Sequence, residues 1–304
     1  MSDDGQTALT IIAFVGSVFS PHYARARRRD GVRAVDPLQH CAFNVALYRP
    51  SGDLWSMSEH GRGERVVRAA EKLQLGRSTM RYEDGGARLI VDIDERTTHV
   101  ASPLGQPLRG RVSLELGGGG TSEALVLDAG GAGRHRWWPV APCARAEVQL
   151  DEPGLRFSGS AYHDCNWGDE PLEQGFARWS WSRLALPGGD CAVLYDVVQR
   201  DGRRDERAMR FGAGGGVQPI ADLERRALPR TRWAVARPTR ADGSASSPRV
   251  LRTLEDTPFY SRSVIASRVG GEIARGVHES LDLDRFSAGW VQFLLPFRMR
   301  RRRA

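Results

Sequence analysis

The feature that most constrains this sequence is the alternation of apolar and polar residues in short runs, which turn-forming residues separate. Such runs occupy residues 42–48, 88–93, 112–116, 155–161, 178–186 and 192–199. Alternation over four to eight residues is the pattern of a strand with one buried face. Together with the 34 glycines and 16 prolines between them, these runs predict an all-β sandwich or barrel.

Helical periodicity is scarce. Residues 63–75 are the one plausible amphipathic helix, because Val66, Val67, Ala70 and Leu73 fall on one stripe. Residues 238–249, which are rich in Pro, Ser, Gly and Arg, predict a mobile surface loop.

The apolar run at residues 9–19 follows Asp3 and Asp4 and lacks a basic region or a small-residue cleavage site. It is also too short to span a bilayer, so it predicts a core strand and neither a signal nor an anchor. No transmembrane segment is expected elsewhere. Glycine runs at residues 117–120 and 214–216 lack the spacing of phosphate-binding loops and predict turns.

Two strand-rich halves flank a polar segment, which places a domain boundary between residues 150 and 175. We therefore predict two β-domains, at residues 1–160 and 161–304. Both contain enough apolar sequence for a packed core, since 40% of the chain is hydrophobic.

The chain is basic, with a net charge of +7 and only one lysine, Lys72. The arginines are scattered, which favours coding bias over a binding stripe, and without a recognised module nucleic-acid binding is not expected. The four cysteines form no CxxC pair, which argues against a zinc module and favours free thiols in a reducing compartment.

The C-terminal segment combines the apolar residues 290–297 with clustered arginines at 298 and 300–303. This composition is typical of an interfacial membrane contact. A docked core segment with a solvated basic end fits equally well, and both interpretations stay open.

Residues 162–170 concentrate more chemistry than any other stretch: Tyr-His-Asp-Cys-Asn-Trp-Gly-Asp-Glu. In an extended strand, Tyr162, Asp164 and Asn166 lie on one face. The other face carries His163, Cys165 and Trp167. Consecutive side chains on one strand cannot all ligate one metal, so no metal site is predicted. A Cys165–His163 nucleophile pair lacks a recognisable oxyanion loop.

Downstream, Asp196 interrupts an apolar run. A carboxylate there is costly unless it is paired or protonated. It is either a strand-end residue bonded to backbone or a buried acid with a raised pKa. Trp179 and Trp181 share one face of the preceding predicted strand and either wall an apolar pocket or pack the core.

Five blocks of this sequence resemble the carotenoid 1,2-hydratase family. They are residues 14–23, 36–48, 162–173, 255–262 and 278–298, so the resemblance covers nearly the whole chain. It implies two tandem lipocalin-like β-barrel or sandwich domains with few short helices, and a cofactor-independent lyase that acts on acyclic carotenoids such as neurosporene and lycopene. At Cys165 the wider superfamily often carries His, so no role is carried over to that position.

The implied reaction adds water to the terminal C1–C2 double bond through protonation at C2 and a tertiary cation at C1. We expect Asp196, or else Asp164, to be the acid, with Asp196 favoured because apolar surroundings raise its pKa most. The expected catalytic residues are Asp196, Asp164, His163, Tyr195 and Tyr162, and the expected substrate contacts are Trp167, Asn166, Trp179 and Trp181. Within these sets Trp167, Trp179 and Tyr195 stabilise the cation, and His163, Tyr162 or Asn166 holds the water.

Two other functions fit the same scaffold. A non-catalytic carrier of an apolar polyene or lipid needs the pocket but not the acid, and a cofactor-free cyclase or isomerase needs the acid but adds no water. For the hydratase we expect a cytoplasmic protein attached peripherally to the inner or intracytoplasmic membrane. The oligomeric state does not follow from the sequence.

Overall fold

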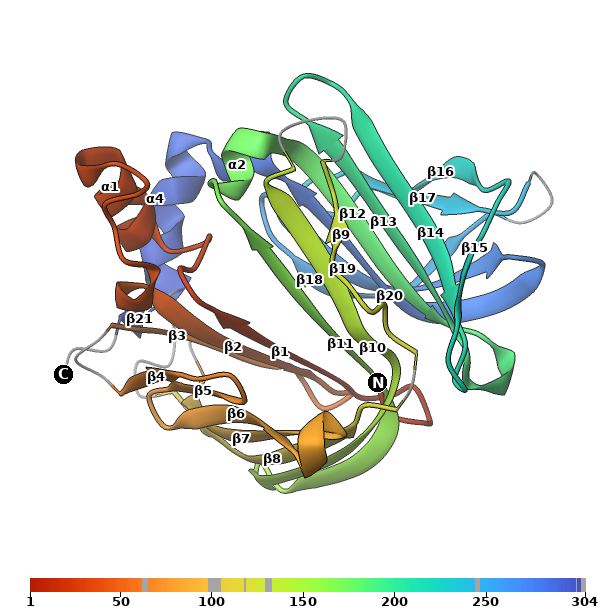
Figure 1. Cartoon of the computed structure of the whole chain (residues 1–304), viewed down its shortest axis with the longest axis horizontal. Helices are drawn as coiled ribbons and strands as arrows, with labels where there is room; N and C mark the ends of the chain where they lie inside the picture. Colours follow the sequence, from red (N-terminus) through yellow and green to blue (C-terminus); the bar gives the residue numbers. More distant parts are fainter. Residues whose placement is uncertain are drawn as a thin grey trace. The chain divides into compact units, whose positions relative to one another are not determined.

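Antiparallel strands dominate the computed structural model, and its helices are few and short (Figure 1). It describes residues 1–61, 65–97, 105–117, 119–128, 133–243, 247–298 and 300–301. The all-β prediction is confirmed, and a strand covers each of the six alternating runs over all or most of its length.

The chain forms two compact units, and both are discontinuous in sequence. The first contains residues 1–116, 144–161 and 292–304, and the second contains residues 117–143 and 162–291. The chain thus passes from one unit to the other at residue 161, next to the expected boundary at residue 160. The first unit also contains residues 292–304 from after that boundary, and the second unit contains residues 117–143 from before it. The division into domains at 1–160 and 161–304 stays a prediction.

In the first unit, one sheet has the strand order β1-β2-β3-β21. Its strands are β1 (Ala8–Phe14), β2 (Cys41–Tyr48), β3 (Leu54–His60) and β21 (Arg300–Arg301). Helix α1 (Pro21–Asp30) begins after Ser20, whose side chain accepts a hydrogen bond from the Tyr23 amide. The strand expected at residues 9–19 is therefore shorter than the apolar run, because β1 ends at Phe14. The N-cap Ser20 and the proline at the first helical position then begin α1.

A second sheet has the order β11-β10-β8-β7-β6-β5-β4, and β9 pairs with β10. Its strands are β4 (Val66–Arg68), β5 (Lys72–Leu75), β6 (Ser78–Glu83), β7 (Arg88–Arg96), β8 (Pro107–Glu115), β9 (Leu125–Val126), β10 (His135–Glu152) and β11 (Leu155–Gly168). Strands β10 and β11 are long and contribute residues to both units.

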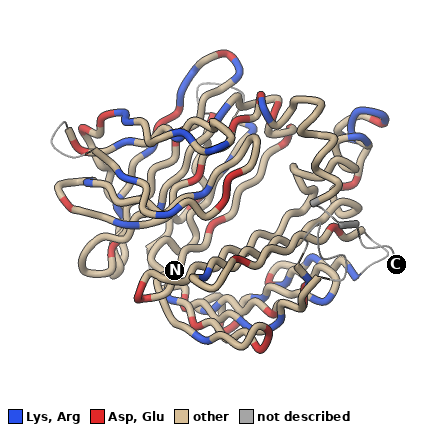
Figure 2. Tube along the Cα trace, turned by 180° about the vertical axis from the view of Figure 1, so that it is seen from behind, with Lys and Arg blue, Asp and Glu red and all other residues tan. Residues whose placement is uncertain are grey.

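Arginines on the second sheet are paired with carboxylates of neighbouring strands. Asp92 on β7 accepts from Arg81 on β6 and from Arg111 on β8, the latter at 2.6 Å. Basic and acidic positions are likewise interspersed along the chain trace (Figure 2). This arrangement agrees with the expectation that the arginines form no single binding stripe.

The second unit is built on a seven-stranded antiparallel sheet in the order β15-β14-β13-β12-β20-β19-β18. Its strands are β12 (Phe176–Ala185), β13 (Cys191–Gln199), β14 (Arg204–Phe211), β15 (Val217–Pro219), β18 (Arg249–Asp256), β19 (Tyr260–Val269) and β20 (Glu272–Asp282). A hairpin of β16 (Glu224–Leu228) and β17 (Arg237–Ala241) pairs separately. The short helices are α2 (Leu172–Gly175) and α3 (Leu283–Phe286), and α4 (Gly289–Arg298) follows.

The core of this unit lies on one face of the seven-stranded sheet. Leu184, Leu194, Leu228 and Ile265 are buried there in one hydrophobic cluster. Because Leu228 belongs to β16, the β16–β17 hairpin packs against this face. The opposite face of the same sheet carries the polar and aromatic residues described below.

The helix predicted at residues 63–75 is wrong. Its described residues form strands β4 and β5, which pair as an antiparallel hairpin. The apolar residues Val66, Val67 and Leu73 also fit this hairpin, in which Val67 is 45% exposed. The apolar residues of a run this short fit both the helical and the strand periodicity, so pairing with neighbouring strands decides which structure forms.

The loop predicted at residues 238–249 is wrong at both ends. Residues 238–241 belong to β17, where Thr239 and Arg240 are buried, and β18 begins at Arg249. Residues 244–246 lie outside the described part of the chain. The sequence did not reveal that Arg240 of this segment is an interior side chain.

All four cysteines are free, as expected for a chain without a disulfide framework. None of the helices in the described residues is long and apolar enough to cross a membrane. Of the basic C-terminal cluster, Arg302 and Arg303 lie outside the described residues.

Gly276 allows β20 to approach β12 closely, and we expect Gly276→Ala to destabilise the fold. A Cβ atom there would lie 1.9 Å from the carbonyl oxygen of Arg183. The resulting backbone shift should lower the free energy of unfolding by about 1–3 kcal/mol in urea denaturation. Gly214→Ala is the control, since a Cβ at Gly214 meets nothing within 4 Å. Equal stability of the two variants would contradict the prediction.

Candidate active site

The candidate site lies on the face of the seven-stranded sheet that is opposite the hydrophobic cluster. Trp181 on β12 is the direct cross-strand partner of Tyr195 on β13 and of Glu279 on β20. Directly opposed residues in antiparallel strands point to the same face. Trp179 lies two residues before Trp181 and shares that face. The sheet thus presents three aromatic rings and one carboxylate together.

Asp164 on β11 receives three hydrogen bonds on one carboxyl oxygen. The donors to its Oδ2 are Trp137 Nε1 at 2.9 Å, Tyr162 Oη at 3.0 Å and Asn166 Nδ2 at 3.2 Å. Within the described residues, Oδ1 accepts no hydrogen bond. Three donors therefore fix the carboxyl group in place while its second oxygen stays available to a reactant.

The pKa of Asp164 is raised to about 6, and loss of solvation on burial is the main cause. The hydrogen bonds from Tyr162, Trp137 and Asn166 act in the opposite direction, because they favour the carboxylate. The negative charge of Glu279 raises the pKa further. At pH 7 about a tenth of such a group is protonated, so Asp164 can serve as a general acid near neutrality.

Aromatic rings surround this carboxyl group. Trp137 is completely buried, and its ring packs edge-on against Tyr195 with centroids 5.0 Å apart. Trp179 contacts the other side of Tyr195 at 5.8 Å, and Tyr162 packs on Trp181 at 4.9 Å. The Tyr195 hydroxyl donates to Asn166 Oδ1 at 3.2 Å. Burial raises the pKa of Tyr162 and of Tyr195, so both phenols stay neutral.

A buried ion-pair triad adjoins this face. Arg262 on β19 is 1% exposed, and its guanidinium donates to Glu279 at 2.7 Å and to Glu255 at 3.3 Å. Two carboxylates share this guanidinium. The negative charge of Glu279 raises the pKa of Asp164 and of Tyr195.

The sequence analysis did not identify Trp137, Glu279 or Arg262. Trp137 precedes a second tryptophan, and only alternation along β10 distinguishes the inward ring from Trp138. Glu279 lies between His278 and Ser280 in a strand of alternating burial. Glu279 is half-buried on the side opposite His278 and Ser280, so burial alternation along this strand gave no signal for it.

His135 is a further residue that the sequence analysis did not identify. It is 4% exposed, lies two residues before Trp137 on β10, and stacks on Phe176 with centroids 4.3 Å apart. Its Nε2 lies 3.2 Å from the Glu170 carboxylate. These contacts join the end of β11 to the start of β12 and thus support the segment that carries Asp164.

Asp196, the acid that the sequence favours, does not join this cluster. It follows Tyr195 directly on β13, so it points to the opposite face of the sheet. There Arg240 on β17 binds both of its oxygens, at 2.6 and 3.0 Å. Burial raises the pKa of Asp196, as the sequence predicts, but Arg240 opposes this shift by favouring the carboxylate. The bidentate ion pair with Arg240 leaves Asp196 poorly suited to donate a proton.

The division of the central segment into two faces agrees with the structure. Tyr162, Asp164 and Asn166 hydrogen-bond to one another, and Tyr195, Trp179 and Trp181 join them. His163, Cys165 and Trp167 alternate to the other side of β11. Burial lowers the pKa of His163 to about 4 and raises that of Cys165 to about 11, and Trp167 is 46% exposed. Their proposed roles gain no support from these positions.

In the described part of the chain, no three His, Cys, Asp or Glu side chains are grouped so that they could hold a metal ion.

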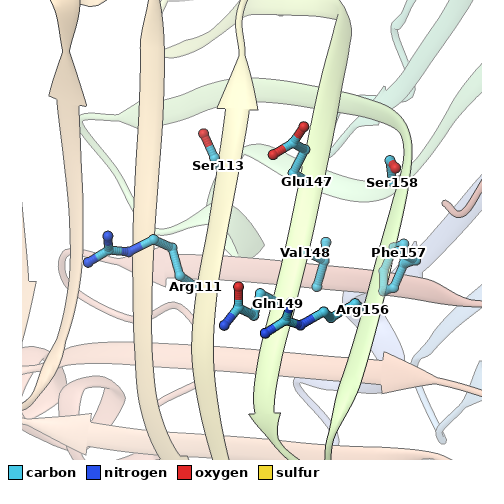
Figure 3. A pocket seen from close by; sticks show the side chains of 8 residues that line it. All are labelled: Arg111, Ser113, Glu147, Val148, Gln149, Arg156, Phe157 and Ser158. Carbon is cyan, nitrogen blue, oxygen red and sulfur yellow. The ribbon is translucent and has the colours of Figure 1, made fainter.

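One pocket of about 410 Å³ lies in the first unit over β8, β10 and β11. Its lining includes Arg111, Glu147, Gln149 and Arg156 (Figure 3). The pocket contains none of the residues around Asp164.

The whole chain can be compared with known proteins. A family model described as carotenoid hydratase CrtC matches residues 11–304. A protein of Thiocapsa roseopersicina named acyclic carotenoid 1,2-hydratase is 45% identical over 99% of this chain and 71% of its own length. Proteins of the same name from Rubrivivax gelatinosus and Cereibacter sphaeroides are 44% and 37% identical, over 99% and 96% of this chain and 71% and 98% of their own lengths.

The crystal structure of kievitone hydratase from Nectria haematococca superimposes with a TM-score of 0.52 at 11% identity, over 81% of this chain and 82% of that one. At this identity the likeness concerns the fold, and it confirms the expected lipocalin-like β architecture. The sequence matches extend over nearly the full length. The chain therefore belongs to the carotenoid hydratase family.

Proposed function

We propose that this protein is an acyclic carotenoid 1,2-hydratase in which Asp164 is the proton donor. The observation that carries the proposal is a carboxyl group of raised pKa, held by three donors on Oδ2 and surrounded by aromatic rings. The names of the full-length relatives supply the substrate class. Asp164 offers what an unactivated trisubstituted alkene requires, which is a neutral acid held in a fixed position and protonated in part near neutral pH.

In the proposed reaction, the Asp164 carboxyl proton adds to C2 of the terminal double bond. The electron pair of that double bond forms the new C–H bond and leaves a tertiary cation at C1. The π-faces of Tyr195, Trp179 and Trp181 stabilise this cation, each by roughly 0.5–2 kcal/mol. Water then attacks C1, and its surplus proton returns to the Asp164 carboxylate. The acid is regenerated and no cofactor is consumed.

Asn166 is the best-placed residue to orient the attacking water. Its amide bridges Asp164 and the Tyr195 hydroxyl, and it is exposed, so solvent reaches it. His163, which the sequence suggested for this role, lies on the other side of β11. Tyr162 remains a second candidate, since its hydroxyl contacts Asp164 directly.

The acyclic carotenoid substrate also bears on where the protein acts. A polyene of this kind dissolves in the bilayer, so we propose peripheral attachment to the inner or intracytoplasmic membrane. The four free thiols favour the reducing, cytoplasmic side.

Asp164→Asn should abolish hydration, with turnover reduced about 10²–10⁴-fold, because the general acid is lost. Asp196→Asn is the matched control and should retain turnover within tenfold. The assay is conversion of lycopene or neurosporene in detergent micelles, with ¹⁸O-labelled water to trace the new hydroxyl group. Retained activity in Asp164→Asn would refute the assigned acid. Binding without product would indicate a carrier, and an altered polyene without ¹⁸O would indicate a cyclase or isomerase.

The pH profile of hydration should report the same acid. Because the protonated form is active, kcat/KM should be constant below the Asp164 pKa of about 6 and fall about tenfold per pH unit above it. Glu279→Gln should shift the fall in kcat/KM to lower pH, since it removes a negative charge that raises the pKa of Asp164. Glu206→Gln should leave the fall in kcat/KM in place, because Glu206 acts on Asp196 instead. An identical shift in both variants would argue against Glu279 as the tuning residue.

The aromatic rings should contribute to the rate in proportion to their cation affinity. Trp179→Leu is expected to lower kcat by roughly 2–30-fold, equivalent to about 0.5–2 kcal/mol of lost cation stabilisation. Trp179→Phe should lose less. The control is Trp138→Phe, because the Trp138 indole instead donates to the Thr121 carbonyl at 2.8 Å. If Leu and Phe at position 179 behaved alike, packing and not cation stabilisation would explain the effect.

A further inference from the structure

Two tryptophans of the second unit are stacked on each other at the surface. Trp233 and Trp290 have ring centroids 6.1 Å apart at an angle of 28°, and they are 48% and 51% exposed. Trp233 sits in a tight turn closed by the Ala234 amide on the Thr231 carbonyl at 2.9 Å. Ala234 takes a left-handed φ of 57° there, a conformation that costs a non-glycine residue about 1–2 kcal/mol. The fold thus holds an indole pair toward solvent.

The helix that begins beside this pair is apolar on its exposed side. Phe293, Leu294 and Phe297 are 69%, 44% and 58% exposed, and they follow Trp290 on α4 at spacings of three, four and seven residues. These spacings place all four side chains on one helix face. Val291 and Leu295 are buried on the other side of α4. Contiguous exposed apolar side chains of this size mark an interaction surface.

Arginines flank the indole pair. Arg230 and Arg232 are exposed on either side of Thr231. Arg285 donates to the Trp233 carbonyl at 2.7 Å, which places its charge beside the turn. Indoles next to arginines match the boundary of a bilayer, which is apolar below and anionic at its surface.

A pocket of about 470 Å³ opens next to the same turn, and Arg230, Arg232 and Arg237 are among its lining residues. Arg237 is 4% exposed and donates to the Pro229 carbonyl and to the hydroxyls of Thr253 and Ser263. Within the described residues no carboxylate pairs with it.

Two carboxylates, Glu255 and Asp256, also line this pocket. Glu255 accepts from Arg262, and Asp256 accepts from the Arg232 amide. Burial lowers the pKa of the Arg237 guanidinium, and the nearby charge of Asp256 opposes that shift. Three arginines still outnumber the two carboxylates of the lining, which gives the pocket a net positive charge. The pocket is suited to a phosphate group.

We propose that the Trp233–Trp290 pair of the second unit docks on an anionic phospholipid bilayer. Arg230, Arg232 and Arg237 would then receive the phosphate of one lipid headgroup. This inference rests on the proposed function, because a bilayer-dissolved substrate is what makes docking useful. Charge complementarity selects the occupant, since a bilayer surface offers anionic phosphates above an apolar layer that accepts indole rings.

The test is co-sedimentation of the full chain with phosphatidylcholine vesicles, with and without phosphatidylglycerol. The wild type should bind the anionic vesicles more tightly. Arg230→Gln with Arg232→Gln should weaken that binding by roughly 30-fold, which corresponds to about 1 kcal/mol per arginine. Trp233→Ser with Trp290→Ser should weaken binding to both kinds of vesicle. Leu251→Ser with Ile273→Ser is the matched control, since these exposed apolar residues on β18 and β20 belong to no such patch.

Binding of the tryptophan variant at the wild-type level, or equal binding with and without phosphatidylglycerol, would overturn the docking proposal. A wild-type dimer in analytical ultracentrifugation that the tryptophan variant does not form would also overturn it, because the surface around Trp233 and Trp290 would then join two copies of the chain. Hydration in detergent micelles separates this proposal from the proposed function. The tryptophan variant should retain micellar turnover. A wild type inactive in micelles but bound to vesicles would refute the hydratase and leave the docking surface intact.

Discussion

The chemistry of this protein depends on the opposed effects that burial and hydrogen bonding have on one carboxyl group. Burial alone would raise the pKa of Asp164 strongly, and three donors on a single oxygen lower it again. The balance leaves a pKa of about 6, at which the acid is both populated and strong enough to donate. Four neighbouring residues contribute to that balance: Tyr162, Trp137, Asn166 and Glu279. Trp137 and Tyr162 supply donors and also exclude water, while Glu279 supplies an opposing charge.

The sequence predicted much of this cluster because strand alternation is a local property. It placed Tyr162, Asp164 and Asn166 on one face, and the six alternating runs became strands. It failed where two patterns fit one segment, as at residues 63–75, where the same apolar residues suit a helix stripe and a short hairpin. In such cases long-range pairing decides, and a single sequence contains no record of that pairing.

The choice between the two acids failed for a related reason. An aspartate inside an apolar run is costly to bury, so Asp196 looked like the stronger candidate. Its partner Arg240 lies 44 residues further along, in a segment whose composition predicts a loop. Asp164 seemed less apolar because its neighbours in sequence are polar. Those neighbours are its hydrogen-bond donors, and the indole that completes the set comes from Trp137 on another strand.

The same hydrogen bonds bear on how the proposed reaction ends. A carboxylate beside a tertiary cation can collapse onto it as an ester, which would halt turnover. Three donors on Oδ2 withdraw electron density from the Asp164 carboxylate and hold it in one orientation. Glu279, the other carboxylate on this face, is bound by the buried guanidinium of Arg262. Oδ1 of Asp164, which accepts no hydrogen bond in the described residues, is the atom that takes up the proton of the attacking water, so that water and not the carboxylate adds to C1. An acid site for hydration must therefore restrain its conjugate base as carefully as it raises the pKa of the acid, and the cluster around Asp164 has the groups to do both.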